Sequence, residues 1–223
     1  MLACWGLGAS LTWWFRKTVI LWLLAPAQGQ LSETGQPIFT GPTEMFTITL
    51  RLTVVGGIVV ALPVLAYHIA RFLSPLLNRR QRRFVAIFLP AAFVCYLAGA
   101  AFAYFVLLPT GLGFLLRFGT DIAIPMIRIS EYMDLALAML FWLGVVFELP
   151  LAMFLLAKLR IVSYQRWKKL RRYVPLAAWT LGMVLTPTVD LVSQTLVAVP
   201  IIILYETGLF LSWLARPRLR AAG

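Results

Sequence analysis

The chain has 223 residues, of which 61% are hydrophobic, and it carries a formal net charge of +12. A soluble domain is closer to half apolar, so this composition argues against a soluble protein and predicts that lipid surrounds most of the chain. The basic excess would suggest nucleic-acid binding in a soluble protein, but in a membrane protein it indicates basic loops on the cytoplasmic side, and no nucleic-acid partner is expected.

Six apolar segments are candidates for membrane-spanning helices, each of which needs about 20 mostly apolar residues. In chain order they are residues 1–15, 46–70, 84–108, 133–157, 173–189 and 191–206. We expect one all-α domain over residues 1–223, with short last two helices, because the sixth segment would be only about 24 Å long at 1.5 Å per residue. Within the third segment, LAGAAFAYF (97–105) predicts a small-residue helix face suited to close packing.

The segment after the first span has two interpretations. In one, residues 16–27 cap the first helix on the outer side of the membrane, and Pro26 ends that cap. In the other, RKTVILWLLAPAQGQ (16–30) is a signal peptide, with a basic pair, an apolar run and an Ala-Pro-Ala cleavage-like site. The basic pair follows fifteen apolar or small residues instead of opening the chain, which favours the first interpretation.

The loops predict the orientation of the chain. Most of the 20 Lys and Arg residues lie between the second and third segments, between the fourth and fifth, or after the sixth. The acidic residues Glu33, Glu44, Asp121, Glu131 and Asp134 fall on the opposite face. By the positive-inside rule, both termini are expected in the cytoplasm.

Three carboxylates lie in or beside the predicted spans. Glu148 is central to the fourth span, and a charge at that depth tends to face a protein interior or a water-filled cavity. We interpret Glu148 as a functional residue; a protonated side chain that is hydrogen-bonded to a neighbouring helix is the alternative. For Asp190 a helix-capping role competes with a functional one, and Gln194 falls on the same helix face at i+4. Glu206 is interpreted as an interfacial residue.

Prolines recur inside the predicted spans, at Pro63, Pro90, Pro150, Pro175 and Pro200. Each removes a backbone hydrogen bond and bends or loosens its helix. Several bends together can curve a group of helices, so Glu148 would face a concave groove instead of lipid.

Five motifs occur in one order along the chain: GPTEMF (41–46), FLSPLLNRRQRRF (72–84), LAGAAFAYFVLLP (97–109), FELP (147–150) and TPTVDLVSQTLVAVPIIILYE (186–206). Together they resemble the TatC family, the multispanning core of the twin-arginine protein translocase. The resemblance implies six helices in a curved, glove-like shape in the inner membrane. It also implies binding of twin-arginine signal peptides on folded cargo, assembly with single-span TatA and TatB subunits, use of the proton motive force, several copies in one complex and no catalysis.

The resemblance also assigns roles to residues. Glu148 would face the concave cavity. The first cytoplasmic loop, part of the signal-peptide surface, would include Phe72, Pro75, Gln81, Arg82 and Arg83. Partner helices would dock at Met183, Pro187, Asp190 and Gln194. Structural prolines would be Pro26, in the first outer loop, with Pro75, Pro150 and Pro200.

The sequence departs from the family pattern at two points. The family usually has a segment like HLxELRxR before the first helix, whose glutamate helps bind the arginine pair, whereas this sequence starts inside that helix. The family also tends to carry Glu where this chain has Gln81, and charge-assisted hydrogen bonds to arginine are about twice as strong as neutral ones. A misassigned start and a divergent copy both stay open as explanations.

Two other functions fit parts of the pattern. A proton-coupled small-molecule transporter would also use a mid-membrane carboxylate and interrupted helices, although no inverted repeat is evident. An enzyme is less favoured, because the sequence offers no nucleophile–base pair, no metal set and no GxGxxG, P-loop or HExxH motif. No cofactor is expected.

Overall fold

The computed structural model describes residues 2–28, 38, 41–73, 79–117, 128–159, 161–185 and 191–215. The helices are α1 (Leu2–Trp14), α2 (Arg16–Gln28), α3 (Glu44–Leu73), α4 (Arg79–Phe102), α5 (Leu108–Arg117), α6 (Ile129–Phe147), α7 (Leu149–Lys158), α8 (Tyr164–Leu170), α9 (Val174–Leu185) and α10 (Leu191–Leu214). A π-helical turn, η2 (Ala103–Leu107), joins α4 to α5, and a 3₁₀ turn, η3 (Arg171–Tyr173), joins α8 to α9. The predicted all-α class is confirmed for this part of the chain.

Four helical runs are long and apolar enough to cross a membrane. They are Glu44–His68, Phe88–Leu116, Ile129–Lys158 and Gln194–Leu214. These runs correspond to the second, third, fourth and sixth predicted segments. The count of six spans and the orientation of the termini stay predictions.

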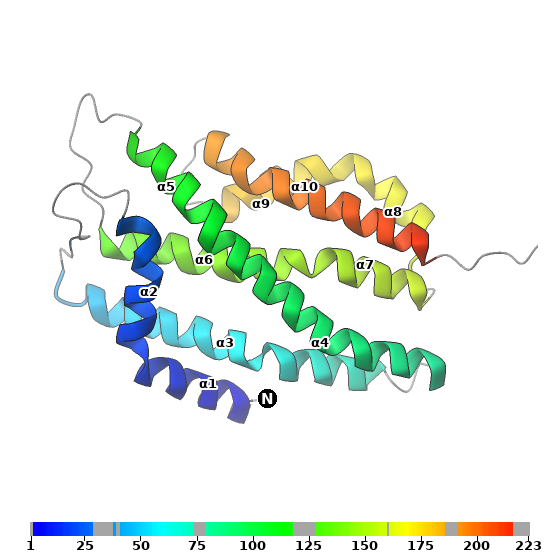
Figure 1. Cartoon of the computed structure of the whole chain (residues 1–223), viewed down its shortest axis with the longest axis horizontal. Coiled ribbons are helices and arrows are strands. Elements are labelled where there is room, and N and C mark those ends of the chain that lie inside the picture. The colour runs from blue at the N-terminus through cyan, green and yellow to red at the C-terminus, as the bar shows by residue number, and fades with distance from the viewer. Residues whose placement is uncertain are drawn as a thin grey trace, which may run out of the picture.

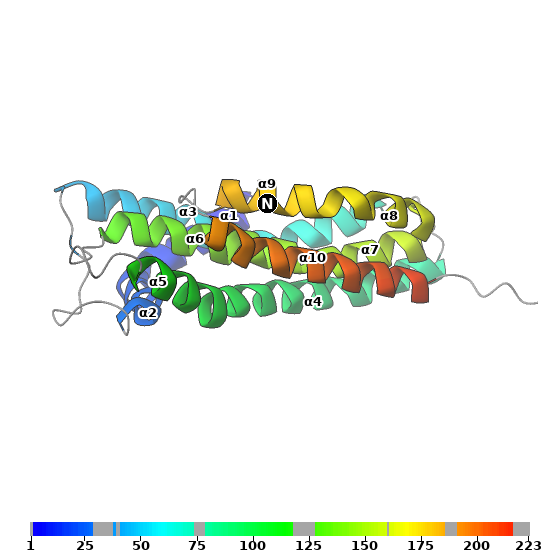
Figure 2. The same ribbon diagram turned by 90° about the horizontal axis from the view of Figure 1, so that it is seen from above.

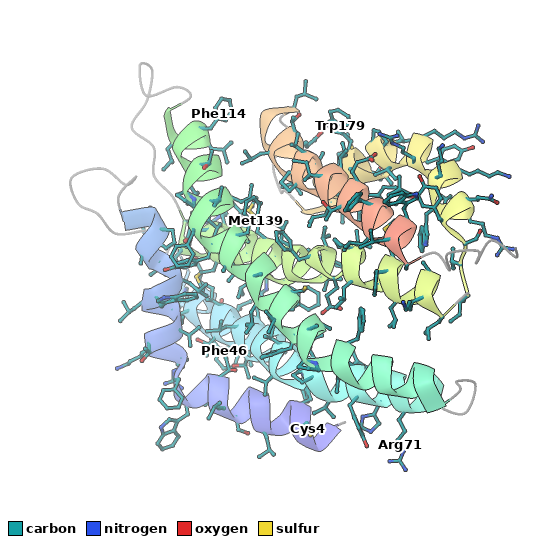
Figure 3. All side chains as sticks on the ribbon, turned by 45° about the vertical axis from the view of Figure 1, so that its right-hand side comes forward. Cys4, Phe46, Arg71, Phe114, Met139 and Trp179 are labelled. Atoms are coloured by element: carbon teal, nitrogen blue, oxygen red, sulfur yellow. The ribbon has the colours of Figure 1, made fainter. Side chains whose placement is uncertain are left out.

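The helices form a bundle in which α3, α6, α7, α8, α9 and α10 run roughly side by side, while α4, η2 and α5 cross them diagonally (Figure 1). Seen from above, α2, α4 and α5 lie on one side, α3, α8 and α9 on the other, and α6, α7 and α10 between them (Figure 2). α6 forms much of the core, because Met133, Ala136 and Leu143 are fully buried. Met139 of the same helix lies in the middle of the bundle, and Arg71 projects from the end of α3 (Figure 3).

Glycines allow α4 and α6 to approach closely. A Cβ on Gly99 would lie 2.6 Å from the backbone oxygen of Leu143, and a Cβ on Gly144 would lie 2.4 Å from Cε2 of Tyr96. The ring of Tyr96 therefore fills the space above Gly144. The small-residue face predicted for 97–105 is confirmed at Gly99, where α4 lies close to the backbone of α6. Small residues allow helix backbones to approach each other closely in lipid.

Two predicted boundaries were wrong. The third helical run continues past residue 108 to Arg117. Pro109 is the second residue of α5, just after the η2 turn, where the hydrogen-bond register changes and Leu108 N–H bonds to Ala103 O. The last helix extends past Glu206 to Leu214, so its 24 residues are about 36 Å long and it is not short. In the fifth segment α9 begins at Val174, one residue after the predicted start, and the short helix α8 and the turn η3 precede it.

The predicted cap after the first helix is itself a helix. α1 ends at Trp14, in agreement with the predicted first span, and α2 follows directly. Pro26 does not end this segment: it lies inside α2, which ends at Gln28. A proline in the last turn of a helix leaves one carbonyl without its usual donor, and that carbonyl needs another partner.

Candidate functional site

Glu148 lies at the junction of two collinear helices, between the end of α6 and the start of α7. Pro150 has no N–H, so the carbonyl of Val146 lacks its i+4 donor. The backbone N–H of Glu148 bonds back to Val145 O at 3.1 Å, and Glu148 O accepts from the N–H of Ala152 at 2.8 Å. The chain therefore keeps its helical course through one loosened turn, and this turn presents the carboxylate.

The Glu148 side chain is not used to hold this junction together. It occupies the N-cap position of α7 but makes no capping hydrogen bond. It is half-buried, and no ion pair involving it occurs within the described residues. A carboxylate inside a candidate span, with no ion-pair partner among the described residues, is a group that a cationic or hydrogen-bonding ligand could engage.

The α4–α6 contact holds Glu148 from the other side. Phe147, next to it in the chain, lies with its ring centroid 5.6 Å from that of Phe102. Its Cβ would also lie 2.8 Å from a Cβ on Gly99. The residue before the carboxylate is thus clamped against α4, which limits how far Glu148 can move along the helix axis. The concave groove expected around Glu148 stays a prediction.

The predicted signal-peptide surface falls largely outside what the structure describes. Phe72 belongs to the end of α3, and Gln81, Arg82 and Arg83 to the start of α4, but their side chains lie outside the described set. Pro75 lies wholly outside it. The structure therefore gives the helical backbone on both sides of this loop, and the roles of these five residues stay predictions.

The predicted partner-docking residues do not share one exposed surface. Met183 on α9 is 58% exposed, beside Val184 at 74%. Gln194 on α10 is only 4% exposed, and a Cβ on Gly182 would lie 3.0 Å from its backbone oxygen. Gln194 is therefore packed against α9, and Met183 faces outward. Pro187 and Asp190 lie outside the described residues.

Two tyrosines attach α2 to the bundle. The hydroxyl of Tyr104 donates to Trp22 O at 2.7 Å, and their rings stack with centroids 4.0 Å apart. Trp22 is the residue whose carbonyl would accept from position 26, where Pro26 has no N–H. The hydroxyl of Tyr132 on α6 donates to the next carbonyl, that of Leu23. Because Pro26 has no N–H, the Trp22 carbonyl lacks its helical donor, and the Tyr104 hydroxyl donates to it instead. Pro200 lies inside α10.

Glu44, from the GPTEMF motif, has a role that the sequence analysis missed. Its Oε1 accepts from the N–H of Ser130 at 3.1 Å, and its Oε2 accepts from the N–H of Gly41 at 3.3 Å. α6 starts with Arg128 at its N-cap, and that side chain makes no capping bond. Glu44 therefore caps α6 from another helix. A carboxylate beside a helix start is a signal for capping, but only the fold reveals which helix it caps.

A second polar site joins α8 and η3 to α10. Nε of Arg171 lies 2.6 Å from Oε1 of Glu206, and the hydroxyl of Tyr205 donates to Trp167 O at 2.7 Å. A cavity of about 390 Å³ lies beside this ion pair. Glu206, which the sequence analysis interpreted as interfacial, forms an ion pair with Arg171. The two residues are 35 apart in the chain, and no local pattern predicts that they meet.

Comparisons with known proteins assign the family. The family model described as Sec-independent protein translocase protein (TatC) matches residues 1–200. The Carboxydothermus hydrogenoformans protein of that name is 38% identical over 181 residues, which are 81% of this chain and 74% of the relative. The Koribacter versatilis protein is 32% identical over 217 residues, which are 96% and 79% of the two chains.

The fold agrees with this assignment. A crystal structure of the twin-arginine translocase receptor TatC matches with a TM-score of 0.84 and 29% identity, and the match covers 96% of this chain and 93% of that one. The five motifs, the helical architecture and the sequence relatives lead to one conclusion: the chain belongs to the TatC family of Sec-independent protein translocase proteins.

Proposed function

We propose that this chain is the membrane core of a twin-arginine translocase, which moves folded proteins with twin-arginine signal peptides across the inner membrane. The match of the TatC family model to residues 1–200 carries this proposal. The solved structure that the fold resembles is named as a twin-arginine translocase receptor. The chain acts by binding and assembly and has no catalytic role in this proposal.

The proposed topology has six spans within a single domain of residues 1–223, with both termini in the cytoplasm. α1 and α9 supply the two spans beyond the four long apolar runs. The ends of α3 and α7 and the start of α8 lie toward one end of the bundle (Figure 1). Exposed basic residues of that end include Arg71, Lys158 and Arg166, in keeping with the positive-inside rule.

Glu148 is the proposed contact for a partner helix or an inserted signal peptide. The support is its position at the α6–α7 junction and the lack of an ion-pair partner in the described part of the chain. A guanidinium or hydroxyl brought by a ligand would gain a charge-assisted hydrogen bond at a depth where water competes weakly. Pro150, buried beside it, shapes the turn.

The proposed partners are single-span TatA and TatB subunits and further copies of this chain, driven by the proton motive force. Docking at Met183 is supported by its 58% exposure beside Val184 on the outer surface of α9. Pro187, Asp190 and Gln194 complete the proposed hairpin surface, with Gln194 acting through its packing against α9. Phe72, Gln81, Arg82 and Arg83 form the proposed signal-peptide surface.

An export assay tests the proposal. A folded fluorescent reporter with a twin-arginine signal is followed into the periplasm of a host that lacks its own copy, with TatA and TatB supplied. We expect export with the wild-type chain and a large loss with Glu148→Ala. Glu131→Ala is the matched control, because that carboxylate is 68% exposed at the opposite end of α6 and should be dispensable.

Each outcome separates the proposed function from the proposed site. No export by a correctly inserted wild-type chain would contradict the translocase proposal and favour a proton-coupled small-molecule transporter. Normal export by Glu148→Ala would leave the translocase proposal intact and remove Glu148 from it. Equal losses for Glu148→Ala and Glu131→Ala would indicate a general effect of charge.

A further inference from the structure

The cavity between α8, η3 and α10 is built from both charged and apolar side chains. Its lining residues are Tyr164, Arg171, Glu206, Leu209, Phe210 and Trp213. One part of the wall is therefore the Arg171–Glu206 ion pair, and another is an apolar and aromatic surface on the last turns of α10. Phe210 and Trp213 are 60% and 49% exposed, and their rings stack 6.0 Å apart.

The ion pair keeps unused binding capacity on both partners. Its contact joins Nε of Arg171 to Oε1 of Glu206. A guanidinium has four more N–H donors on its two terminal nitrogens, and a carboxylate has a second oxygen. Those groups make no hydrogen bond with the described part of the chain. The side chains are 58% and 38% exposed, so a ligand can reach both charges at once.

The residues around the cavity are of the types that are enriched at a membrane–water interface. α8 and η3 carry exposed Lys168, Lys169 and Arg172 next to Arg171. Trp167 and Tyr173 stand among these basic residues, and Trp213 lies across the cavity on α10. Aromatic and basic residues are enriched where helices leave the hydrocarbon. Basic pockets between such helices bind lipid head groups.

We propose that this cavity binds the head group of phosphatidylethanolamine. The phosphate accepts hydrogen bonds from the terminal nitrogens of Arg171, and the primary ammonium donates to the second oxygen of Glu206. One acyl chain lies along Leu209, Phe210 and Trp213. A ligand with both charges matches a wall that presents both, and it leaves the Arg171–Glu206 contact intact.

The proposal commits to this lipid over others that share part of its chemistry. Phosphatidylglycerol has the phosphate but no cation, so it would meet Glu206 with an uncompensated negative charge. Phosphatidylcholine has a cation without N–H donors, so it could not hydrogen-bond to the carboxylate. Free phosphoethanolamine has both charges but no acyl chain, so it would lose the contacts with Phe210 and Trp213.

Native mass spectrometry of the full chain in detergent tests the proposal with these four probes added at equal concentration. We expect phosphatidylethanolamine to bind about tenfold more tightly than phosphatidylcholine, because the difference is one hydrogen bond to a charged group. We expect no detectable retention of free phosphoethanolamine. Equal binding of the two zwitterionic lipids by the wild-type chain would overturn the proposal without any variant being made.

Two variants locate the preference. Glu206→Gln should bring the ratio between phosphatidylethanolamine and phosphatidylcholine close to one, and Arg171→Gln should weaken the binding of both lipids. Asp134→Asn is the matched control, because Arg51–Asp134 is also an exposed ion pair between two helices and is outside this cavity. A preference that survives in Glu206→Gln, or that is lost in Asp134→Asn, would contradict the assignment. Tighter binding of phosphatidylglycerol than of phosphatidylethanolamine would also overturn it.

Discussion

The hydrogen bond from Tyr104 to Trp22 allows a quantitative test of why Pro26 is tolerated inside α2. Position 26 has no N–H to give to the Trp22 carbonyl, and the Tyr104 hydroxyl donates to it at 2.7 Å instead. Tyr104 is only 6% exposed, so water cannot readily replace it. Tyr104→Phe keeps the stacked ring and removes the donor. The variant should therefore leave the carbonyl unpaired.

The expected cost is about 1 kcal/mol, between the average of about 0.6 for hydrogen bonds in membrane helices and the 1–3 for a stranded buried acceptor. For a chain of this length, that is a fall of about 2–4 °C in the midpoint of thermal unfolding. The midpoint would be measured in one detergent for the wild type and for Tyr104→Phe. Circular dichroism would verify equal helix content before heating.

The control is the same substitution in a Pro26→Ala background. An alanine at this position restores the N–H that the Trp22 carbonyl would accept in an unbroken helix, so Tyr104→Phe should then cost much less. The difference between the two costs is the coupling between residues 26 and 104, and it should be about 1 kcal/mol. An equal cost in both backgrounds would refute the idea that Tyr104 replaces the donor that Pro26 lacks.

Three further substitutions test the packing, capping and ion pairs. Gly144→Ala should destabilise the chain by about 1–3 kcal/mol, because its Cβ would lie 2.4 Å from the Tyr96 ring. The control Gly6→Ala has open space around its Cβ and should stabilise α1 or leave its stability unchanged. The midpoints of thermal unfolding check both expectations. Glu44→Ala should cost about 0.5–2 kcal/mol by uncapping α6, and hydrogen exchange should rise first at Ser130. Asp134→Asn should cost less than about 1 kcal/mol, because both partners of its ion pair are exposed; a larger loss would mean that lipid shields the pair from water.

The apolar runs predicted the existence of the main helices well. The thickness of the bilayer sets the need for about 20 apolar residues in a spanning helix, and this need depends little on the neighbouring helices. Their ends were less predictable. The third predicted segment ended at residue 108 and the sixth at residue 206, yet the helices continue past both positions. The η2 turn precedes Pro109, and Arg171 neutralises Glu206. The Arg171–Glu206 contact joins residues 35 apart, so it lies outside the local pattern.

Sequence patterns predicted the location of Glu148 better than the partners of other polar residues. FELP marks a carboxylate beside a helix breaker, and both features lie within four residues of each other. Glu44 and Ser130 are 86 residues apart, and Tyr104 and Trp22 are 82 apart. Such pairs depend on how helices are arranged. A local pattern can therefore show that a side chain needs a partner without showing which one it has.

Glu148 differs from the other described carboxylates in its contacts. Five have described side chains, and four of these hold other parts of the chain together: Glu44 caps α6, Glu131 contacts Arg128, Asp134 contacts Arg51 and Glu206 contacts Arg171. Glu148 alone among these five has neither a capping bond nor an ion pair.

Its removal should therefore affect export and stability differently. Glu148→Ala leaves no charge unpaired, so the unfolding midpoint should stay unchanged or rise, whereas Glu206→Ala strands Arg171 and should lower it. Export by Glu148→Ala should nevertheless fall, because the lost group serves a ligand and not the fold. Parallel measurement of unfolding and export would decide the point. A fall in the unfolding midpoint that matches the loss of export would make Glu148 a structural residue.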